Sequence, residues 1–292
     1  MSEIVRAITE DGCVLVIAAD TTDTVEEARR IHGTSKVCTA ALGRTLTAAA
    51  MMGKLLKNKD NSVTIRINGG GPAGSVIAVS DYDLNTRGYI MDPSVELPLN
   101  DKGKLDVGTA VGKNGLIGVI KDLGGTEPTV GQVPLVSGEI AEDVTQYFAV
   151  SEQIPTVCGL GVLVNPDKTV AVAGGFLIQL LPAADEEIIE KVEKGLKQIK
   201  SVTSMMADGL SAFDICKAVL PEFTVQELDR NNFGYKCNCS RQRVEAALIS
   251  TGRSSLLEMA QDPVTEVKCH FCPTVYKFTP DEIKALLTNA HD

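Results

Sequence analysis

Two short stretches, Cys237-Asn238-Cys239 and Cys269-His270-Phe271-Cys272, decide how the last part of this 292-residue chain folds. Zinc takes four ligands in a tetrahedron and binds thiolate sulfur readily, and a C-x-x-C turn directs two sulfurs at a common centre. The C-x-C pair is a rarer arrangement, because alternate side chains of an extended segment converge only where the backbone bends. We therefore predict one zinc ion per chain, with Cys237, Cys239, Cys269 and Cys272 as its ligands.

The rest of the chain provides a much larger framework. Its length exceeds that of a usual single domain, and 44% of its residues are hydrophobic against 23% charged, which is enough apolar material for a sizeable core. We predict an α+β fold in three parts. These are a mixed sheet-and-helix body at residues 1–182, a helical linker at 183–229 and a small zinc-binding domain at 230–292.

Local patterns predict the elements of these parts. Alternating apolar residues around the turn Glu10-Asp11-Gly12 predict a hairpin of strands at 4–8 and 13–19. Thr24 is the expected N-cap of a first helix, and a segment rich in Ala, Leu and Met predicts a second, long helix at 35–57. Further along, 156–164 and 169–181 read as paired antiparallel strands, and 185–200 and 211–220 as helices.

The net charge of −10 lies in the body rather than in the cysteine-rich part. An acidic surface repels phosphate backbones, so we expect no nucleic-acid partner. The early apolar run at 13–19 is too short for a secretory signal, and no apolar stretch is long enough to span a bilayer. We therefore expect a cytoplasmic protein with no membrane partner. In that reducing setting its eight cysteines are free or metal-bound, and Cys13, Cys38, Cys158 and Cys216 are expected to be small core residues.

A metal-dependent tail offers a physical basis for a switch. A part as small as 230–292 gains at most ~3 to 5 kcal/mol from its core, whereas structural zinc contributes on the order of 10 to 16 kcal/mol that is also folding energy. Oxidants attack thiolates, and disulfide formation removes the ligands. Oxidation is therefore expected to unfold the tail and to uncover apolar side chains that can bind other unfolded chains. In the linker the side chains expected to be uncovered are Met205, Met206, Leu210, Phe213 and Ile215.

These features, together with two body segments, resemble the redox-regulated bacterial heat-shock chaperones of thirty-three kilodaltons, which are ATP-independent holdases. The resemblance covers nearly the whole chain, and it is carried by residues 235–241 (YKCNCSR), 269–278 (CHFCPTVYKF), 41–48 (ALGRTLTA) and 147–156 (YFAVSEQIPT). It implies zinc on the four cysteines in the reduced state. In the oxidised state it implies disulfides joining Cys237 with Cys239 and Cys269 with Cys272. It also implies activation by oxidative stress, binding of unfolded client proteins and a homodimeric active form.

Two other functions remain as alternatives. One is a zinc-ribbon nucleic-acid module in which Lys236, Arg241, Arg243 and Lys268 contact phosphates, which the acidic body disfavours. The other is a thiol-disulfide oxidoreductase. Such enzymes place C-x-x-C at the start of a helix in a βαβ unit, whereas here a strand-like segment follows at 275–278.

No catalytic site and no cofactor other than zinc is predicted. Gly69, Gly71 and Gly74 satisfy the G-x-G-x-x-G spacing of dinucleotide loops. That loop must open a helix whose N-terminus receives the phosphates, whereas residues 75–79 read as a strand. We expect a chaperone and not an enzyme.

Overall fold

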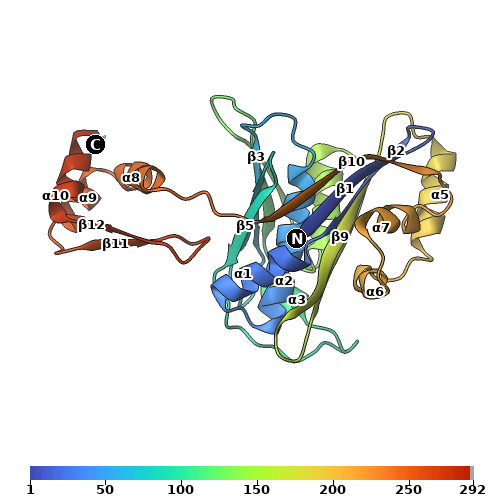
Figure 1. Cartoon of the computed structure of the whole chain (residues 1–292), viewed down its shortest axis with the longest axis horizontal. Helices are drawn as coiled ribbons and strands as arrows, with labels where there is room; N and C mark the ends of the chain where they lie inside the picture. Colours follow the sequence, from blue (N-terminus) through green and yellow to red (C-terminus); the bar gives the residue numbers. More distant parts are fainter. Residues whose placement is uncertain (290–292) are drawn as a thin grey trace. The chain divides into compact units, whose positions relative to one another are not determined.

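The first of two structural units, Met1–Lys236, is built on one ten-stranded sheet (Figure 1). The computed structural model describes residues 1–289, and its second unit begins at Cys237. The strands lie in the order β7-β6-β3-β4-β5-β10-β1-β2-β9-β8. Their bounds are β1 Ser2–Thr9, β2 Val14–Asp20, β3 Ser62–Asn68, β4 Val76–Asp81, β5 Asn85–Ile90, β6 Leu116–Asp122, β7 Thr129–Pro134, β8 Thr156–Val164, β9 Val170–Leu180 and β10 Val225–Tyr235.

Strand β10 joins the two halves of this sheet. It runs antiparallel to β1 along its length and pairs with β5 in parallel only at its end, where Gly234 lies opposite Asn85 and Tyr235 opposite Thr86. The expected hairpin is confirmed, because β1 and β2 pair antiparallel, and so is the expected pairing of β8 with β9. The α+β class predicted from the sequence is confirmed as well.

Helix α2 fills the space between the two halves of the sheet. Its residues are buried almost throughout, and it contacts β3, β4 and β5 from one half and β2, β8 and β9 from the other. The hydroxyl of Ser35 caps the helix by accepting a hydrogen bond from the backbone N–H of Cys38 at 3.2 Å. The helices on this side of the sheet are α1 Thr22–His32, α2 Lys36–Gly53, α3 Val107–Val111 and α4 Ala141–Tyr147, the last continued by a π-helical turn at Phe148–Glu152.

Three further helices cover the other face of β1, β2 and β9. They are α5 Glu186–Leu196, α6 Val202–Ala207 and α7 Ala212–Ala218. Met205, Met206 and Ile215 are buried in a second core cluster shared with these strands. The helices between residues 186 and 218 therefore pack on the body sheet, whereas residues 225–229 form the first half of its strand β10. Residue 230, the expected start of the tail, also lies inside β10. The chain divides at Lys236 because residues 230–235 continue β10 beside β1 and β5.

The glycine-rich loop before β4 packs against the end of α3. The backbone N–H of Gly71 donates to the carbonyl of Val111 at 2.9 Å, and Asn114 donates to the carbonyl of Gly69 at 3.0 Å. A Cβ built on Gly69 would lie 2.0 Å from the carbonyl oxygen of Gly112. A strand and not a helix follows the loop, as expected, so the glycines serve backbone packing rather than phosphate binding.

Gly69→Ala is expected to destabilise the first unit by about 3 kcal/mol, the upper end of the usual cost of over-packing, because the new methyl group meets backbone and not a movable side chain. Urea unfolding followed by circular dichroism measures the effect. Gly125→Ala is the matched control, since the nearest atom to its Cβ lies 3.8 Å away. Equal midpoints for the two variants would contradict the packing role of Gly69.

The second unit is a small α/β module with its own core. Its elements are α8 Arg241–Ile249, α9 Arg253–Met259, β11 Thr265–Lys268, β12 Val275–Phe278, α10 Pro280–Leu286 and a 3-10 turn at Leu287–Asn289. Its buried cluster consists of Leu248, Leu256, Phe278 and Ile283 in the described part of the chain. Thr279 and Glu282 form a capping box at the start of α10, which fixes where the chain turns after β12.

Candidate metal centre

The C-x-x-C stretch forms a knuckle between β11 and β12. These strands pair antiparallel with Lys268 opposite Val275, and the backbone N–H of Cys269 donates to the carbonyl of Thr274 at 3.0 Å. This hydrogen bond closes the turn, so the side chains of Cys269 and Cys272 are presented from one tight loop. The hairpin therefore presents two of the four sulfurs from one loop.

The C-x-C stretch lies between the end of β10 and the start of α8. Cys237 and Cys239 belong to an irregular segment that ends at Ser240, whose hydroxyl accepts from the backbone N–H of Arg243 at 3.3 Å and caps α8. The two side chains of a C-x-C pair converge only where the backbone bends. Here the backbone bends between the extended segment and the start of α8.

The structure brings all four cysteines together. The sulfur atoms of Cys237, Cys239, Cys269 and Cys272 all lie within 4.8 Å of one another. The Sγ atoms of Cys237 and Cys269 are 3.7 Å apart, and those of Cys239 and Cys272 are 3.5 Å apart. A tetrahedral zinc ion with Zn–S bonds of about 2.3 Å needs sulfurs about 3.8 Å apart. The donor set and its spacing therefore fit a zinc ion, and the four cysteines can hold a metal.

The thiols differ in their electrostatic environment. Burial raises the pKa of Cys237 and of Cys269. Burial also acts on Cys272, but hydrogen bonds with Thr274, Cys239 and Cys237 outweigh it and lower the pKa of that thiol to about 7. Of Cys237, Cys269 and Cys272, only Cys272 has its pKa shifted toward the thiolate, the form that binds metals and reacts with oxidants.

Two residues that the sequence analysis gave no role contact the sulfurs. The hydroxyl of Tyr276 donates to Sγ of Cys239 at 3.1 Å, and this bond raises the pKa of Tyr276 to about 12. Thr274 lies with its Oγ1 3.3 Å from Sγ of Cys272. Groups of this kind orient metal ligands from outside the coordination sphere. The sequence offered one signal for these two contacts, because both residues follow the C-x-x-C stretch within four positions.

Arg241 has a structural task near the centre. Its guanidinium pairs with Glu282 at 2.6 Å and lies 4.2 Å from the ring centroid of Phe278. It also donates to the carbonyl of Lys277 at 3.0 Å. From the sequence, Arg241 was considered as a phosphate contact of a nucleic-acid module, whereas in the structure its side chain ties α8 to β12 and α10.

The four remaining cysteines lie outside the centre. Cys38, Cys158 and Cys216 are buried, as expected for core residues, and burial raises the pKa of Cys216 to about 12. Cys13, immediately before β2, is only partly buried and packs at the edge of the second core cluster. Among residues 1–289 no helix is both long and apolar enough to cross a membrane.

Comparisons with known proteins cover both units. The family model described as Hsp33 protein matches residues 2–279. A "33 kDa chaperonin" of Lachnoclostridium phytofermentans is 47% identical over 99% of this chain and 99% of its own length. A protein of the same name from Clostridioides difficile is also 47% identical, over 97% of this chain and 98% of its own length.

A solved structure agrees with these relatives. The crystal structure of a 33 kDa chaperonin, a heat shock protein 33 homologue from Thermotoga maritima, matches with a TM-score of 0.87 and 38% identity, covering 98% of each chain. The predicted resemblance to thirty-three-kilodalton heat-shock chaperones is thereby confirmed, and the chain belongs to the Hsp33 family of heat-shock chaperones.

Proposed function

We propose that this chaperone is switched by oxidation of its four-cysteine centre. When reduced, the chain holds one zinc ion through Cys237, Cys239, Cys269 and Cys272 and is inactive. When oxidised, it loses the ion, unfolds its C-terminal region and binds unfolded client proteins to prevent their aggregation. The active form is a homodimer in the cytoplasm, where thiols are normally kept reduced.

The convergence of four sulfurs in a unit with a small core carries this proposal. In the described part of the second unit the buried cluster has four side chains, and the four sulfurs lie within 4.8 Å of one another. A core of this size supplies at most ~3 to 5 kcal/mol, so the fold of the unit depends on the bonds made by its thiolates. Bound zinc would supply a cross-link between the C-x-C segment and the knuckle.

Oxidation removes that cross-link by removing its ligands. Two cysteine thiols lose two electrons and two protons to a peroxide, forming one disulfide and leaving the peroxide oxygens as water. We propose the pairs Cys237 with Cys239 and Cys269 with Cys272, each within one stretch. Sulfurs from different stretches are also neighbours in the reduced arrangement, so the pairing is part of what the experiment must measure.

Loss of order is proposed to reach the linker at residues 183–229. Helices α5, α6 and α7 bury the apolar face of β1, β2 and β9, with Met205, Met206 and Ile215 among the buried side chains. Leu210 and Phe213 are partly buried against the same cluster. If these helices leave the sheet, both their own apolar faces and that of the sheet become available to clients.

The test compares reduced and oxidised protein from one preparation. Zinc-loaded protein is treated with hydrogen peroxide at a mildly denaturing temperature, and released zinc, remaining thiols and disulfide pairing are measured on the same sample. We expect one zinc released, four thiols lost, the two proposed pairs in the disulfide map, and suppression of the aggregation of chemically denatured citrate synthase.

A matched variant keeps the test specific. Cys13 lies outside the centre, but its thiol is partly exposed, as are the four thiols of the centre. The Cys13→Ser variant is therefore expected to behave like the unchanged protein. An oxidised, zinc-free protein that suppresses aggregation no better than the reduced form would refute the proposed function.

A further inference from the structure

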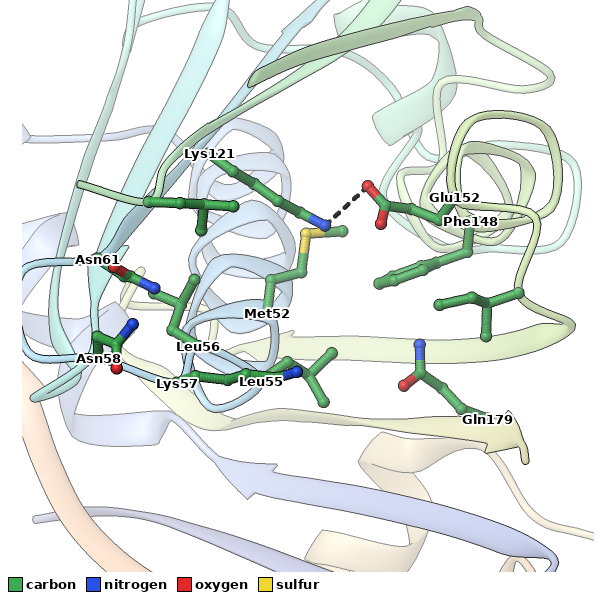
Figure 2. A pocket seen from close by; sticks show the side chains of 12 residues that line it. Met52, Leu55, Leu56, Lys57, Asn58, Asn61, Lys121, Phe148, Glu152 and Gln179 are labelled. Carbon is green, nitrogen blue, oxygen red and sulfur yellow. Dashed lines mark ion pairs between the residues drawn. The ribbon is translucent and has the colours of Figure 1, made fainter. Parts of the chain in front are cut away.

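The first unit contains a pocket at the C-terminal end of α2 that the metal centre does not use (Figure 2). Its volume is about 530 Å³, which is within the range of ligand sites in proteins. It is lined from four separate parts of the first unit: the end of α2, the end of β6, the segment after α4, and β9. The lining residues are Met52, Leu55, Leu56, Lys57, Asn58, Asn61, Lys121, Leu123, Phe148, Glu152, Ile154 and Gln179.

The walls of this pocket are mainly apolar. Met52 and Phe148 are each 3% exposed and form part of the main core, against which Leu55 and Leu56 also pack. Leu123 is 50% exposed. An apolar wall that continues into an exposed leucine favours an apolar ligand group entering from solvent.

A buried amide in the lining lacks a partner. Asn61 is 5% exposed, and within residues 1–289 its Oδ1 is buried without a hydrogen-bond partner. Because that oxygen has almost no accessible surface, it does not face the cavity, and the amide nitrogen of Asn61 is the group left to meet a ligand there. The amide of Gln179, itself 6% exposed, lines the same pocket, and its Nε2 donates to Oγ1 of Thr156 at 3.4 Å, which leaves its oxygen as an acceptor. Side-chain amides carry both donors and acceptors, as peptide groups do.

The one carboxylate among the described lining residues is already paired. The ammonium of Lys121 lies 2.7 Å from the carboxylate of Glu152, the contact drawn as a dashed line in Figure 2. The hydroxyl of Tyr147 donates to the same carboxylate. The carboxylate in the lining is thus already neutralised, so it does not call for a cationic ligand.

We propose that this pocket binds a large apolar side chain of an extended client polypeptide, while the amide nitrogen of Asn61 and the amide oxygen of Gln179 hydrogen-bond its peptide groups. The inference rests on the proposed chaperone function and assigns one client contact to the body itself. The pocket is already formed in the folded first unit, so it is a fixed anchor, whereas the surfaces under α5–α7 have to be uncovered.

Methyl NMR tests the assignment directly. The chain has seven methionines, of which Met52 lines the pocket and Met91 is 60% exposed outside it. With ¹³C-methyl-methionine labelling of the full chain, titration with N-acetyl-Leu-Phe-Leu-amide is expected to shift the Met52 signal and leave Met91 unchanged. Decanoate serves as a second probe. A Met52 signal that moves with decanoate but not with the peptide, or with neither, would overturn the proposal.

A variant pair tests the same pocket by affinity. Leu123→Glu places a charge in the lining near Glu152 and is expected to weaken peptide binding about tenfold, or roughly 1.4 kcal/mol. Leu116→Glu is the matched control, because Leu116 lies at the start of β6, which ends just before Leu123, and it is 45% exposed and does not line this pocket. Equal peptide affinity in the two variants counts against the proposal.

Failure of this inference is separable from failure of the switch. Suppose that the oxidised unchanged protein suppresses client aggregation and that the oxidised Leu123→Glu variant does so equally well at every ratio of chaperone to client. The pocket is then not a client site, and the proposed switch stands. If the Met52 signal shifts with peptide but oxidation brings no gain in activity, the pocket stands and the switch fails.

Discussion

Removing the metal from the reduced protein is expected to unfold the unit that begins at Cys237 and to leave the first unit folded. Structural zinc contributes on the order of 10 to 16 kcal/mol in small domains, against at most ~3 to 5 kcal/mol from a core of this size. The four sulfurs connect an irregular segment before α8 with the knuckle between β11 and β12, and these segments lose their cross-link together.

Hydrogen exchange under a strong chelator and excess reductant measures this. We expect the amides of Leu248, Leu256 and Ile283 to lose protection, while those of β2 and β9 in the sheet keep theirs. Re-addition of zinc should restore protection and magnesium should not, because magnesium does not favour thiolate ligands. Cys239→Ser is expected to reproduce the loss without a chelator, and Cys13→Ser to leave protection unchanged. A second unit that stays protected after chelation would show that loss of zinc does not unfold it, which contradicts the proposed switch.

Truncation of the largest core side chain of the second unit should weaken zinc binding from a distance. Phe278 is 1% exposed, packs with Leu256 and Ile283, and carries the guanidinium of Arg241 over its ring. Phe278→Ala is expected to cost about 3 to 5 kcal/mol of folding energy. Because folding and binding energy are shared in such a unit, the apparent zinc Kd should rise on the order of a hundred- to a few-thousandfold.

Competition with a chromophoric chelator measures that Kd, and the same variant is expected to release zinc at a lower peroxide concentration. Val275→Ala is the control on the same strand, since Val275 is 40% exposed and its truncation removes little buried surface. A Phe278→Ala variant with an unchanged Kd would show that the metal site is formed without the core.

The sequence predicted the strongly patterned elements well and the short or polar ones poorly. The long apolar helix at 35–57 is present as α2, although it ends at Gly53. Helices α3 and α6 were missed, because five and six residues give too few turns for a periodic pattern. Thr24 is not a cap: it lies inside α1, buried, with its hydroxyl 2.8 Å from that of Ser2. Ser2, its hydrogen-bond partner, is 22 residues away in the chain, and local sequence patterns do not indicate such a contact.

Strand β10 shows why the part boundaries were harder to predict. It is largely exposed and rich in polar residues, so it has no clear alternation, and its partner β1 lies at the other end of the chain. The cysteine centre was predictable for the opposite reason. Residue types and their spacing alone indicate a metal site. The contacts of Tyr276 and Thr274 with the sulfurs, in contrast, depend on where the hairpin places these side chains.

The position of β10 also bears on how the protein is made. As the chain leaves the ribosome, β1 meets β2 at once, but its other edge has no partner until residues 225–235 emerge. Until then the nascent body exposes an unpaired strand edge, a feature that promotes aggregation. A protein of the heat-shock response is thus itself, during synthesis, a candidate client for other chaperones.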